Sequence, residues 1–369
     1  MKIVIAASYG PSLIKFRGNL IKKWVSRGHD VVCISIEPAE EMAEQIKQLG
    51  ASYYCVAGDR TGTSVFGGFK MISDYKKAFD EIKPDLVFLY MSKPIAFGGI
   101  AAIQCKIKRI AVFQTGLEIA FYSKGLKNYL LRILLKTIYK YVQKHCETVF
   151  FMCHEDERKM LEWGLVKKEQ VCYVDGSGVD MSHFVKSKLP EAPIVLMIAR
   201  LVWSKGIREY IEAAKIIKPK YPNAEFLLVG GMDENSEALK QDEIDLLQKE
   251  KIIKYYGYQD DVRPYLDMCS IFVLPSYHEG KGTSILEAQA VGRPVITTTA
   301  PGCSETVIDG YNGYLVPPKD GKALAEKILN LVENAAKREE MAENAYAFCK
   351  KTFDVNIINN NICERLEIK

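Results

Sequence analysis

The regular alternation of short apolar runs with helical segments constrains this chain more than any other feature of its sequence. Residues 2–8 form an apolar run closed by Tyr-Gly-Pro, an amphipathic segment follows over 13–27, and a second apolar run covers 30–36. This succession predicts a β-α-β unit. Strands that are apolar along their whole length are typical of parallel sheets covered by helices on both faces. We therefore predict an α/β fold of doubly wound parallel sheets.

The same rhythm occurs twice, before and after a turn-rich stretch at 176–193. A chain of 369 residues exceeds what one hydrophobic core usually supports, so we predict two Rossmann-like domains with a ligand cleft at the carboxyl ends of their strands. The expected parts are an N-terminal domain (1–176), a linker (177–192), a C-terminal domain (193–350) and a tail (351–369), for which packing against the first domain is one arrangement. Further strands are expected at 51–57, 85–91, 109–115, 147–153 and 170–176, then at 193–199, 224–231, 251–257, 270–276, 293–299 and 312–318, with helices at 206–217, 321–334 and 337–350.

Cysteine usage and hydropathy point to the cytoplasm. The ten cysteines show no C-x-x-C pairing and the five histidines are scattered, so we expect reduced core thiols and no metal site. The apolar run at the start of the sequence is interrupted too early by Tyr9, Gly10 and Pro11 for a secretory signal. No apolar stretch reaches the roughly 20 residues that a bilayer span requires.

Charge is distributed unevenly. Residues 1–150 carry 22 Lys and Arg against 12 Asp and Glu, a formal charge of +10, whereas the remainder carries −6. A basic N-terminal half suits an anionic membrane surface or a phosphorylated partner. Because no nucleic-acid-binding motif accompanies the charge, we expect no nucleic acid partner. A solvated lysine-rich surface is the alternative.

The most informative segment runs from 274 to 302. A buried strand is expected to end at Pro275, a loop then carries Glu279, and a helix beginning near Thr283 or Ser284 carries Glu287. Carboxylates can accept paired hydrogen bonds from sugar or ribose hydroxyls. The backbone amides of Gly282, Thr283 and Ser284 at the helix N-terminus favour a phosphate, and Gly280 and Gly282 permit close backbone approach. Taken singly, Glu279 is also explained as a loop carboxylate and Glu287 as an exposed helix residue beside the helix dipole.

A second constellation lies at 197–214. A strand is expected to end at Arg200 and a helix to begin near Gly206, which places Arg200 and Lys205 at the edge of the expected cleft. Both cations suit a diphosphate and would stabilise the negative charge that grows on a leaving nucleoside diphosphate. The alternative is a pair of solvated loop cations.

With the E-x7-E spacing of Glu279 and Glu287, this loop resembles the signature of glycosyltransferase family 4. The resemblance covers essentially the whole chain and implies a retaining enzyme of GT-B architecture, two Rossmann-like domains facing a central cleft, that needs no cofactor or metal. It implies that Arg200 and Lys205 bind the donor diphosphate, Glu279 the donor sugar and Glu287 the ribose. The turn at Gly257 and Tyr258 would border the base.

Within that family, the chain resembles enzymes that add N-acetylgalactosamine to a sugar on a polyprenyl diphosphate. The segments that carry this resemblance are PIVLMIARLVWSKGIREY, VGGMDEN and IFVLPSYHEG. The implied partners are a UDP-sugar donor, best assigned as UDP-N-acetylgalactosamine, and a polyprenyl-diphosphate-linked saccharide acceptor. Capsule and O-antigen transferases are similar and remain an alternative. A GT-B UDP-sugar 2-epimerase and a non-catalytic assembly partner are two further alternatives.

The acceptor side is less defined. The family's usual paired glycines are reduced to Gly10 in SYGPS. The region FQTGLEIAFY contains Glu118, a candidate acceptor-side residue for which an ordinary loop carboxylate is the alternative.

No two aspartates lie two positions apart, so the D-x-D pattern of metal-dependent glycosyltransferases is missing. No G-x-G-x-x-G follows the first strand, which disfavours a nicotinamide-dependent dehydrogenase.

Residues 122–146 form a basic amphipathic segment, with Lys and Arg at six positions among apolar and aromatic residues. Such a helix can lie on anionic lipid. Its alternative is a core-packed helix with a solvated lysine edge. Because the implied acceptor is lipid-linked, we expect a cytoplasmic protein peripherally attached to the inner face of the cytoplasmic membrane.

Overall fold

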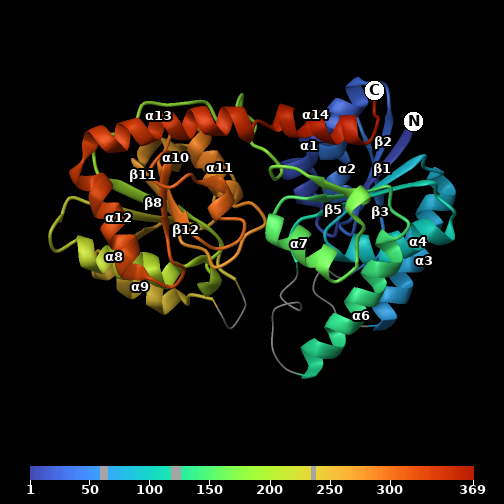
Figure 1. Cartoon of the computed structure of the whole chain (residues 1–369), viewed down its shortest axis with the longest axis horizontal. Coiled ribbons are helices and arrows are strands. Elements are labelled where there is room, and N and C mark those ends of the chain that lie inside the picture. Colours follow the sequence, from blue (N-terminus) through green and yellow to red (C-terminus); the bar gives the residue numbers. More distant parts are fainter. Residues whose placement is uncertain (59–64, 118–125, 234–237) are drawn as a thin grey trace. The chain divides into compact units, whose positions relative to one another are not determined.

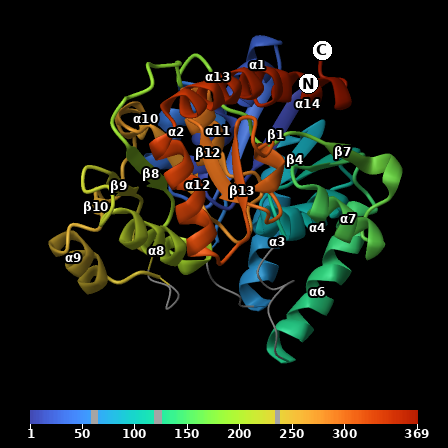
Figure 2. The ribbon, with the colours of Figure 1, turned by 60° about the vertical axis from the view of Figure 1, so that its left-hand side comes forward.

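A computed structural model describes residues 1–58, 65–117, 126–233 and 238–369, which form two compact units (Figure 1). Unit 1 comprises Met1–Ser177 and Ile358–Lys369, and unit 2 comprises Gly178–Ile357. Each unit contains one wholly parallel sheet with helices around it (Figure 2). The predicted α/β class is therefore confirmed.

The sheet of unit 1 has seven strands in the order β3-β2-β1-β4-β5-β6-β7. The chain thus builds outward from β1 to β3, crosses back, and continues from β4 on the other side of β1. The strands are β1 (Lys2–Ala6), β2 (Asp30–Ser35), β3 (Ser52–Cys55), β4 (Leu86–Tyr90), β5 (Arg109–Gln114), β6 (Thr148–Phe151) and β7 (Val171–Tyr173).

Two helical layers cover this sheet because successive side chains of a strand point to opposite faces. In β1, Ile3 and Ile5 pack in one core with α1 and α2, whereas Val4 and Ala6 pack in the other with α3, α4 and α6. The helices are α1 (Gly10–Ser26), α2 (Ala39–Lys47), α3 (Val65–Ile82), the π-helix η1 (Pro94–Gly98), α4 (Gly99–Gln104), α6 (Leu126–Gln143), α7 (His154–Glu162) and the 3-10 helix η2 (Lys168–Gln170).

The C-terminal segment of the chain completes unit 1. The helix α14 (Val355–Arg365) begins in unit 2, and from Ile358 onward its residues belong to unit 1. Ile358, Ile362 and Leu366 are buried in the same core as Trp24 of α1. Arg109 donates a hydrogen bond of 2.6 Å to the carbonyl oxygen of Leu366. The end of the chain is thus an integral part of the N-terminal core.

The sheet of unit 2 has six strands in the order β10-β9-β8-β11-β12-β13. The direction of winding reverses between β8 and β11, which are hydrogen-bonded neighbours. The strands are β8 (Ile194–Ile198), β9 (Glu225–Val229), β10 (Lys254–Tyr255), β11 (Ile271–Leu274), β12 (Val295–Thr298) and β13 (Gly313–Val316). The helices are η3 (Trp203–Lys205), α8 (Ile207–Ile217), α9 (Gln241–Lys249), α10 (Arg263–Met268), α11 (Thr283–Ala290), η4 (Ser304–Thr306), α12 (Gly321–Glu333) and α13 (Ala335–Thr352).

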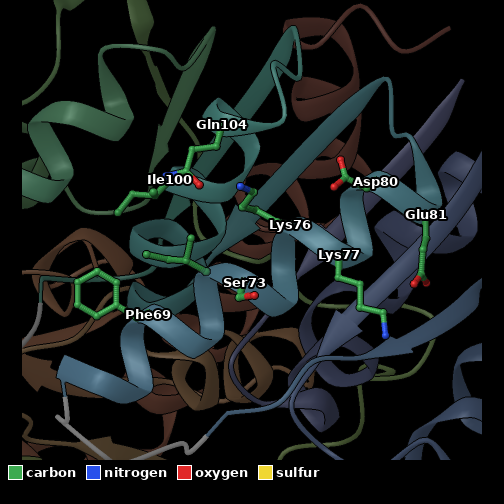
Figure 3. A pocket seen from close by; sticks show the side chains of 9 residues that line it. Phe69, Ser73, Lys76, Lys77, Asp80, Glu81, Ile100 and Gln104 are labelled. Atoms are coloured by element: carbon green, nitrogen blue, oxygen red, sulfur yellow. The ribbon is translucent and has the colours of Figure 1, made fainter.

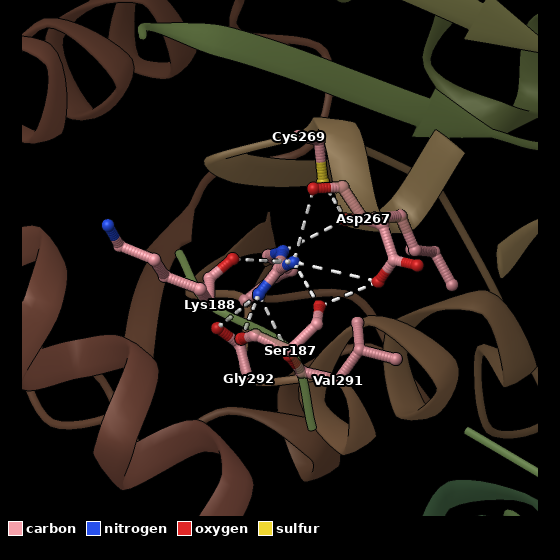
Figure 4. Close-up of polar contacts among 8 residues, drawn as sticks. Ser187, Lys188, Asp267, Cys269, Val291 and Gly292 are labelled. Atoms are coloured by element: carbon pink, nitrogen blue, oxygen red, sulfur yellow. Dashed lines mark hydrogen bonds and ion pairs between the residues drawn. The ribbon is translucent and has the colours of Figure 1, made fainter. Parts of the chain in front are cut away.

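A buried arginine fastens the segment before β8 to unit 2 (Figure 4). The guanidinium of Arg293 donates to the carbonyl oxygen of Ser187 at 3.1 Å and to its hydroxyl at 2.6 Å. It also donates to the carbonyl oxygens of Leu266 and Val291. These bonds compensate the burial of the charge. Ser187 is thereby held within unit 2.

All thirteen predicted strands contain an observed strand, and the main differences concern helix ends. The first helix starts at Gly10 rather than 13, because Pro11 fits the first turn of a helix. The helix expected from Gly206 begins at Ile207, since Gly206 takes the left-handed conformation with φ +80°.

Candidate functional site

The predicted donor-site residues of unit 2 lie where the winding of its sheet reverses. Arg200 and Lys205 follow β8, and Glu279 follows β11, the neighbouring strand. In open α/β sheets, ligands bind outside the carboxyl ends of the strands at this switch point. We call the segments 199–206 and 275–282 the cation loop and the acid loop.

Lys205 and Glu279 are in direct contact. The Lys205 Nζ lies 2.5 Å from Glu279 Oε1, and both side chains are largely buried. The interpretation of Lys205 as a solvated loop cation is therefore wrong. A charge pair held in partly desolvated surroundings is stronger than an exposed one. The structure thus brings together one predicted cation and one predicted carboxylate that are 74 residues apart.

The cation loop and the acid loop approach each other so closely that residue 206 has no room for a side chain. Gly206 packs against Pro275, and a Cβ at residue 206 would lie 2.0 Å from the Pro275 carbonyl oxygen. Gly302 packs in the same way against the backbone of Glu279 and Gly280. The backbone amide of Glu279 donates to the Pro301 carbonyl oxygen at 3.1 Å. The acid loop is therefore fixed by backbone contacts on both sides.

Arg200 is placed differently from Lys205. Its side chain is 68% exposed, and Nη1 lies 3.2 Å from Asp233 Oδ2. Asp233 was missed in the sequence analysis, although its position shortly after the Gly-Gly pair that follows β9 was a usable signal. An exposed pair of this kind contributes little to stability. Arg200 therefore has the freedom to reorient toward a ligand.

The helix α11 begins directly after the acid loop. Its N-cap residue Gly282 supplies no side chain to the first helical amides. The hydroxyl of Ser284 instead donates to the carbonyl oxygen of Ile198 at 3.0 Å, which ties the helix N-terminus to the end of β8. The first amides of a helix have no partner within the helix and attract anions. Thr283 and Ser284 thus present an anion-attracting terminus at the switch point.

Glu287 lies in the second turn of α11 and is only 6% exposed. The interpretation of Glu287 as an exposed helix residue is therefore wrong. Burial of a carboxylate carries a desolvation penalty, so its presence in an otherwise apolar run calls for a specific interaction.

The remaining predicted residues are more scattered. Gly257, with φ +70°, accepts a backbone hydrogen bond from Gly230, and Tyr258 is exposed beside Gly231. In unit 1, Gly10 begins α1, and its amide donates to Glu37 Oε2 at 2.8 Å. Glu118 lies outside the described residues.

The thiol of Cys303 lies 3.9 Å from the carbonyl oxygen of Ser276 in the acid loop. Burial, with a smaller contribution from Glu279, raises the pKa of Cys303 to about 12. The thiol therefore stays protonated at neutral pH, and thiolate chemistry requires the deprotonated form. Among the described residues, no cluster of three or more His, Cys, Asp or Glu is arranged to hold a metal ion.

A groove of about 810 Å³ in unit 1 lies apart from these residues (Figure 3). It runs between α3 and α4 and is lined by Phe69, Ile72 and Ile100 together with lysines and acids of α3. None of the predicted site residues lines it.

Two family models match this chain. The family described as "Glycosyl transferases group 1" matches residues 180–348, and "Glycosyl transferase 4-like" matches residues 14–152. The first match lies within unit 2 and the second within unit 1.

Similar proteins are glycosyltransferases too. The N,N'-diacetylbacillosaminyl-diphospho-undecaprenol alpha-1,3-N-acetylgalactosaminyltransferase of Campylobacter jejuni is 31% identical, over 97% of this chain and 96% of its own. The capsular polysaccharide biosynthesis glycosyltransferase CapM of Staphylococcus aureus is 28% identical over 85% of each chain.

HepE of Anabaena, solved with UDP-glucose, superposes with a TM-score of 0.78 over 100% of this chain and 99% of that chain, at 20% identity. Sucrose-phosphate synthase of Thermosynechococcus elongatus gives 0.79 over 100% and 98%, at 21% identity. The predicted GT-B fold and family resemblance are thereby confirmed. This chain belongs to the group 1, family 4 glycosyltransferases of glycan biosynthesis.

Proposed function

We propose that this glycosyltransferase moves N-acetylgalactosamine from UDP-N-acetylgalactosamine to a saccharide on a polyprenyl diphosphate, with retention of anomeric configuration. The Campylobacter relative supports this donor sugar and acceptor class through its name, and HepE supports the uridine nucleotide. CapM is a capsular enzyme, so capsule-type acceptors are the second candidate.

The observation that carries the donor side is the contact of Lys205 with Glu279 at the switch point. In the proposed complex, Lys205 exchanges the carboxylate for the donor diphosphate, and Arg200 adds a second cation. The amides of Thr283 and Ser284 complete the phosphate site. Glu279, released from Lys205, accepts hydrogen bonds from the donor sugar.

Glu287 is proposed to bind the ribose, with Gly257 and Tyr258 beside the base. Gly280 and Gly282 let the donor approach the backbone of the acid loop. Gly10 and Glu118 are proposed on the acceptor side. No protein nucleophile is assigned.

The proposed reaction relies on stabilisation of the leaving group. The bond between the sugar anomeric carbon and the diphosphate oxygen breaks, and the acceptor hydroxyl oxygen bonds to the same face of that carbon. A phosphate oxygen of the leaving UDP accepts the hydroxyl proton. Cations and helix amides that face the diphosphate stabilise the charge that develops on it, which accelerates the step.

The surface of α6 supports a membrane-attached acceptor. Its inner face packs in the core through Tyr139 and Val142, yet its outer face exposes Tyr129, Ile133, Leu134 and Tyr141. Lys140 of α6 and Lys144, directly after the helix, are exposed as well. Four large exposed side chains on one helix favour lipid contact over the alternative of a core-packed helix with a solvated lysine edge.

Phe69, near the N-terminus of α3, is also exposed, and the N-termini of α3 and α6 lie at the same end of unit 1 (Figures 1 and 2). Exposed apolar side chains together with exposed lysines suit insertion into an anionic lipid surface. We therefore propose peripheral attachment to the inner face of the cytoplasmic membrane. Within the part of the chain that the structure describes, no helix has the length and hydropathy of a membrane span.

The test is a donor screen with a defined acceptor. Purified enzyme is given UDP-N-acetylgalactosamine, UDP-N-acetylglucosamine, UDP-glucose or UDP-galactose together with a saccharide on undecaprenyl diphosphate, and the product linkage is determined by NMR. We expect transfer from UDP-N-acetylgalactosamine with an α-linkage. Consumption of the donor without any acceptor would instead indicate an epimerase.

Lys205→Ala is expected to lower turnover about 100-fold or more, the usual effect of removing one group that stabilises developing charge. Lys254→Ala is the matched control, because Lys254 forms a 2.6 Å surface pair with Glu225 in the same unit. Equal activity of the two variants would refute the donor-site assignment.

A further inference from the structure

Tyr277 connects the acid loop to the cation loop. Its backbone amide donates to the carbonyl oxygen of Ser204 at 2.9 Å, and the hydroxyl of Ser276 donates to the same oxygen at 3.3 Å. Ser204 immediately precedes Lys205, and Tyr277 lies two residues before Glu279. The contact therefore joins the two loops next to both members of the charge pair.

The side chain of Tyr277 reaches a third element. Its hydroxyl lies 2.8 and 3.0 Å from the two carboxylate oxygens of Glu209 in the first turn of α8. The Nζ of Lys319 lies 5.1 Å from the centroid of the Tyr277 ring. The ring is thus held at its edge by a carboxylate and at its face by a cation.

The carboxylate of Glu209 is buried, which carries a desolvation penalty. Glu209 is only 7% exposed, and among the described residues its carboxylate is hydrogen-bonded by the Tyr277 hydroxyl and takes part in no ion pair. A buried carboxylate without a cation is disfavoured unless it accepts hydrogen bonds from neighbouring groups. The hydroxyl of Tyr277 donates and the carboxylate accepts, and burial followed by Glu209 raises the pKa of Tyr277.

We propose that Glu209 and Tyr277 form a positioning pair, which keeps Lys205 and Glu279 at the spacing that a sugar-nucleotide diphosphate requires. This inference rests on the proposed donor site. When the diphosphate takes the place of the Glu279 carboxylate on Lys205, the direct bond between the charged groups is lost. The bonds of Tyr277 to Ser204 and Glu209 then hold the two loops together.

The experiment is a double-mutant cycle on UDP affinity, measured by calorimetry with the full-length protein. Lys205→Ala is expected to raise the Kd for UDP about 10-fold or more, and Tyr277→Phe about 5-fold or more, as for the loss of a hydrogen bond to a charged group. In the Tyr277→Phe background, Lys205→Ala is expected to raise the Kd by less than about 3-fold, because coupled residues are not additive.

Tyr221→Phe is the matched control, because the Tyr221 hydroxyl donates to Glu333 at 2.6 Å on the surface of the same unit. Its affinity for UDP should equal that of the wild type. Glu209→Gln keeps an acceptor for the hydroxyl and should bind UDP more tightly than Glu209→Ala. If Tyr277→Phe fails to fold, the cycle is run with Glu209→Ala in its place, because Ala also removes the bond to the Tyr277 hydroxyl.

Two negative results have different meanings. If Lys205→Ala weakens UDP binding as expected but its effect is undiminished in the Tyr277→Phe protein, the positioning pair is refuted and the donor site stands. If Lys205→Ala leaves UDP affinity unchanged, the proposed donor site fails, and the pair loses its function with it.

Discussion

Substituting Gly206 with Ala should separate the two loops of the proposed donor site. Gly206 has φ +80°, a conformation that costs a residue with a Cβ about 1–2 kcal/mol. The new Cβ would also lie 2.0 Å from the carbonyl oxygen of Pro275, whereas real Cβ contacts stay beyond 3.0 Å. The loops must therefore move apart by about 1 Å, a displacement that typically costs about 100-fold in rate at a reacting centre.

Gly310→Ala is the matched control, because Gly310 has φ +76° but nothing within 4 Å of the added Cβ. Both variants should lose about 1–2 kcal/mol of unfolding free energy from backbone strain, measured by urea denaturation. Only Gly206→Ala should also lose about 100-fold in kcat/KM for the UDP-sugar. If Gly206→Ala turns over donor as fast as Gly310→Ala, the spacing of the loops does not matter and the reasoning fails.

Three further predictions follow from the structure. Deleting residues 358–369 removes Ile358, Ile362 and Leu366 from the core of unit 1, and each buried side chain contributes about 1.5–3 kcal/mol of stability. Hydrogen exchange should therefore accelerate in β1 while β8 stays protected, and equal protection of both strands would contradict this. Glu287→Gln should lower kcat/KM for the UDP-sugar about 10-fold or more through loss of a charge-assisted bond to ribose, and wild-type kinetics would rule out that role. Replacing exposed Ile133 and Leu134 with Ser should weaken binding to anionic phosphatidylglycerol vesicles about 10-fold or more. The control Leu246→Ser, at a similarly exposed site on α9, should have no effect. Identical binding of both proteins would show that α6 does not contact the membrane.

The strands were predictable because a parallel strand buried on both faces must be apolar along its whole length. Each predicted run extends one to several residues beyond the observed strand, since residues flanking a strand, such as Ala7 after β1, are buried too. The start of α1 was predicted late because the amphipathic pattern only becomes regular at Leu13, whereas the helix is initiated by Pro11.

The candidate site was predictable only in part. Motifs within one segment, such as the acid loop and the start of α11, can be recognised locally. The burial of Glu287 could have been inferred, because Ile285, Leu286, Ala288 and Ala290 surround it in sequence and are all buried. The Glu209–Tyr277 contact could not, because it joins positions 68 residues apart and Glu209 sits in an ordinary-looking amphipathic helix.

The acceptor side shows the same limit. The family resemblance left Gly10 as the remnant of the paired glycines on the acceptor side, and its amide donates to Glu37, which follows β2 and carries no motif. Such long-range polar contacts depend on strand order in the sheet rather than on local spacing.

The central claim is that one nucleotide diphosphate binds at the switch point between β8 and β11. A crystal structure of the protein with UDP tests it directly. We expect the diphosphate against Lys205 and the amides of Thr283 and Ser284, with the ribose on Glu287. A nucleotide bound away from these residues, or one that leaves the Lys205–Glu279 contact intact and its phosphates in solvent, would contradict the account.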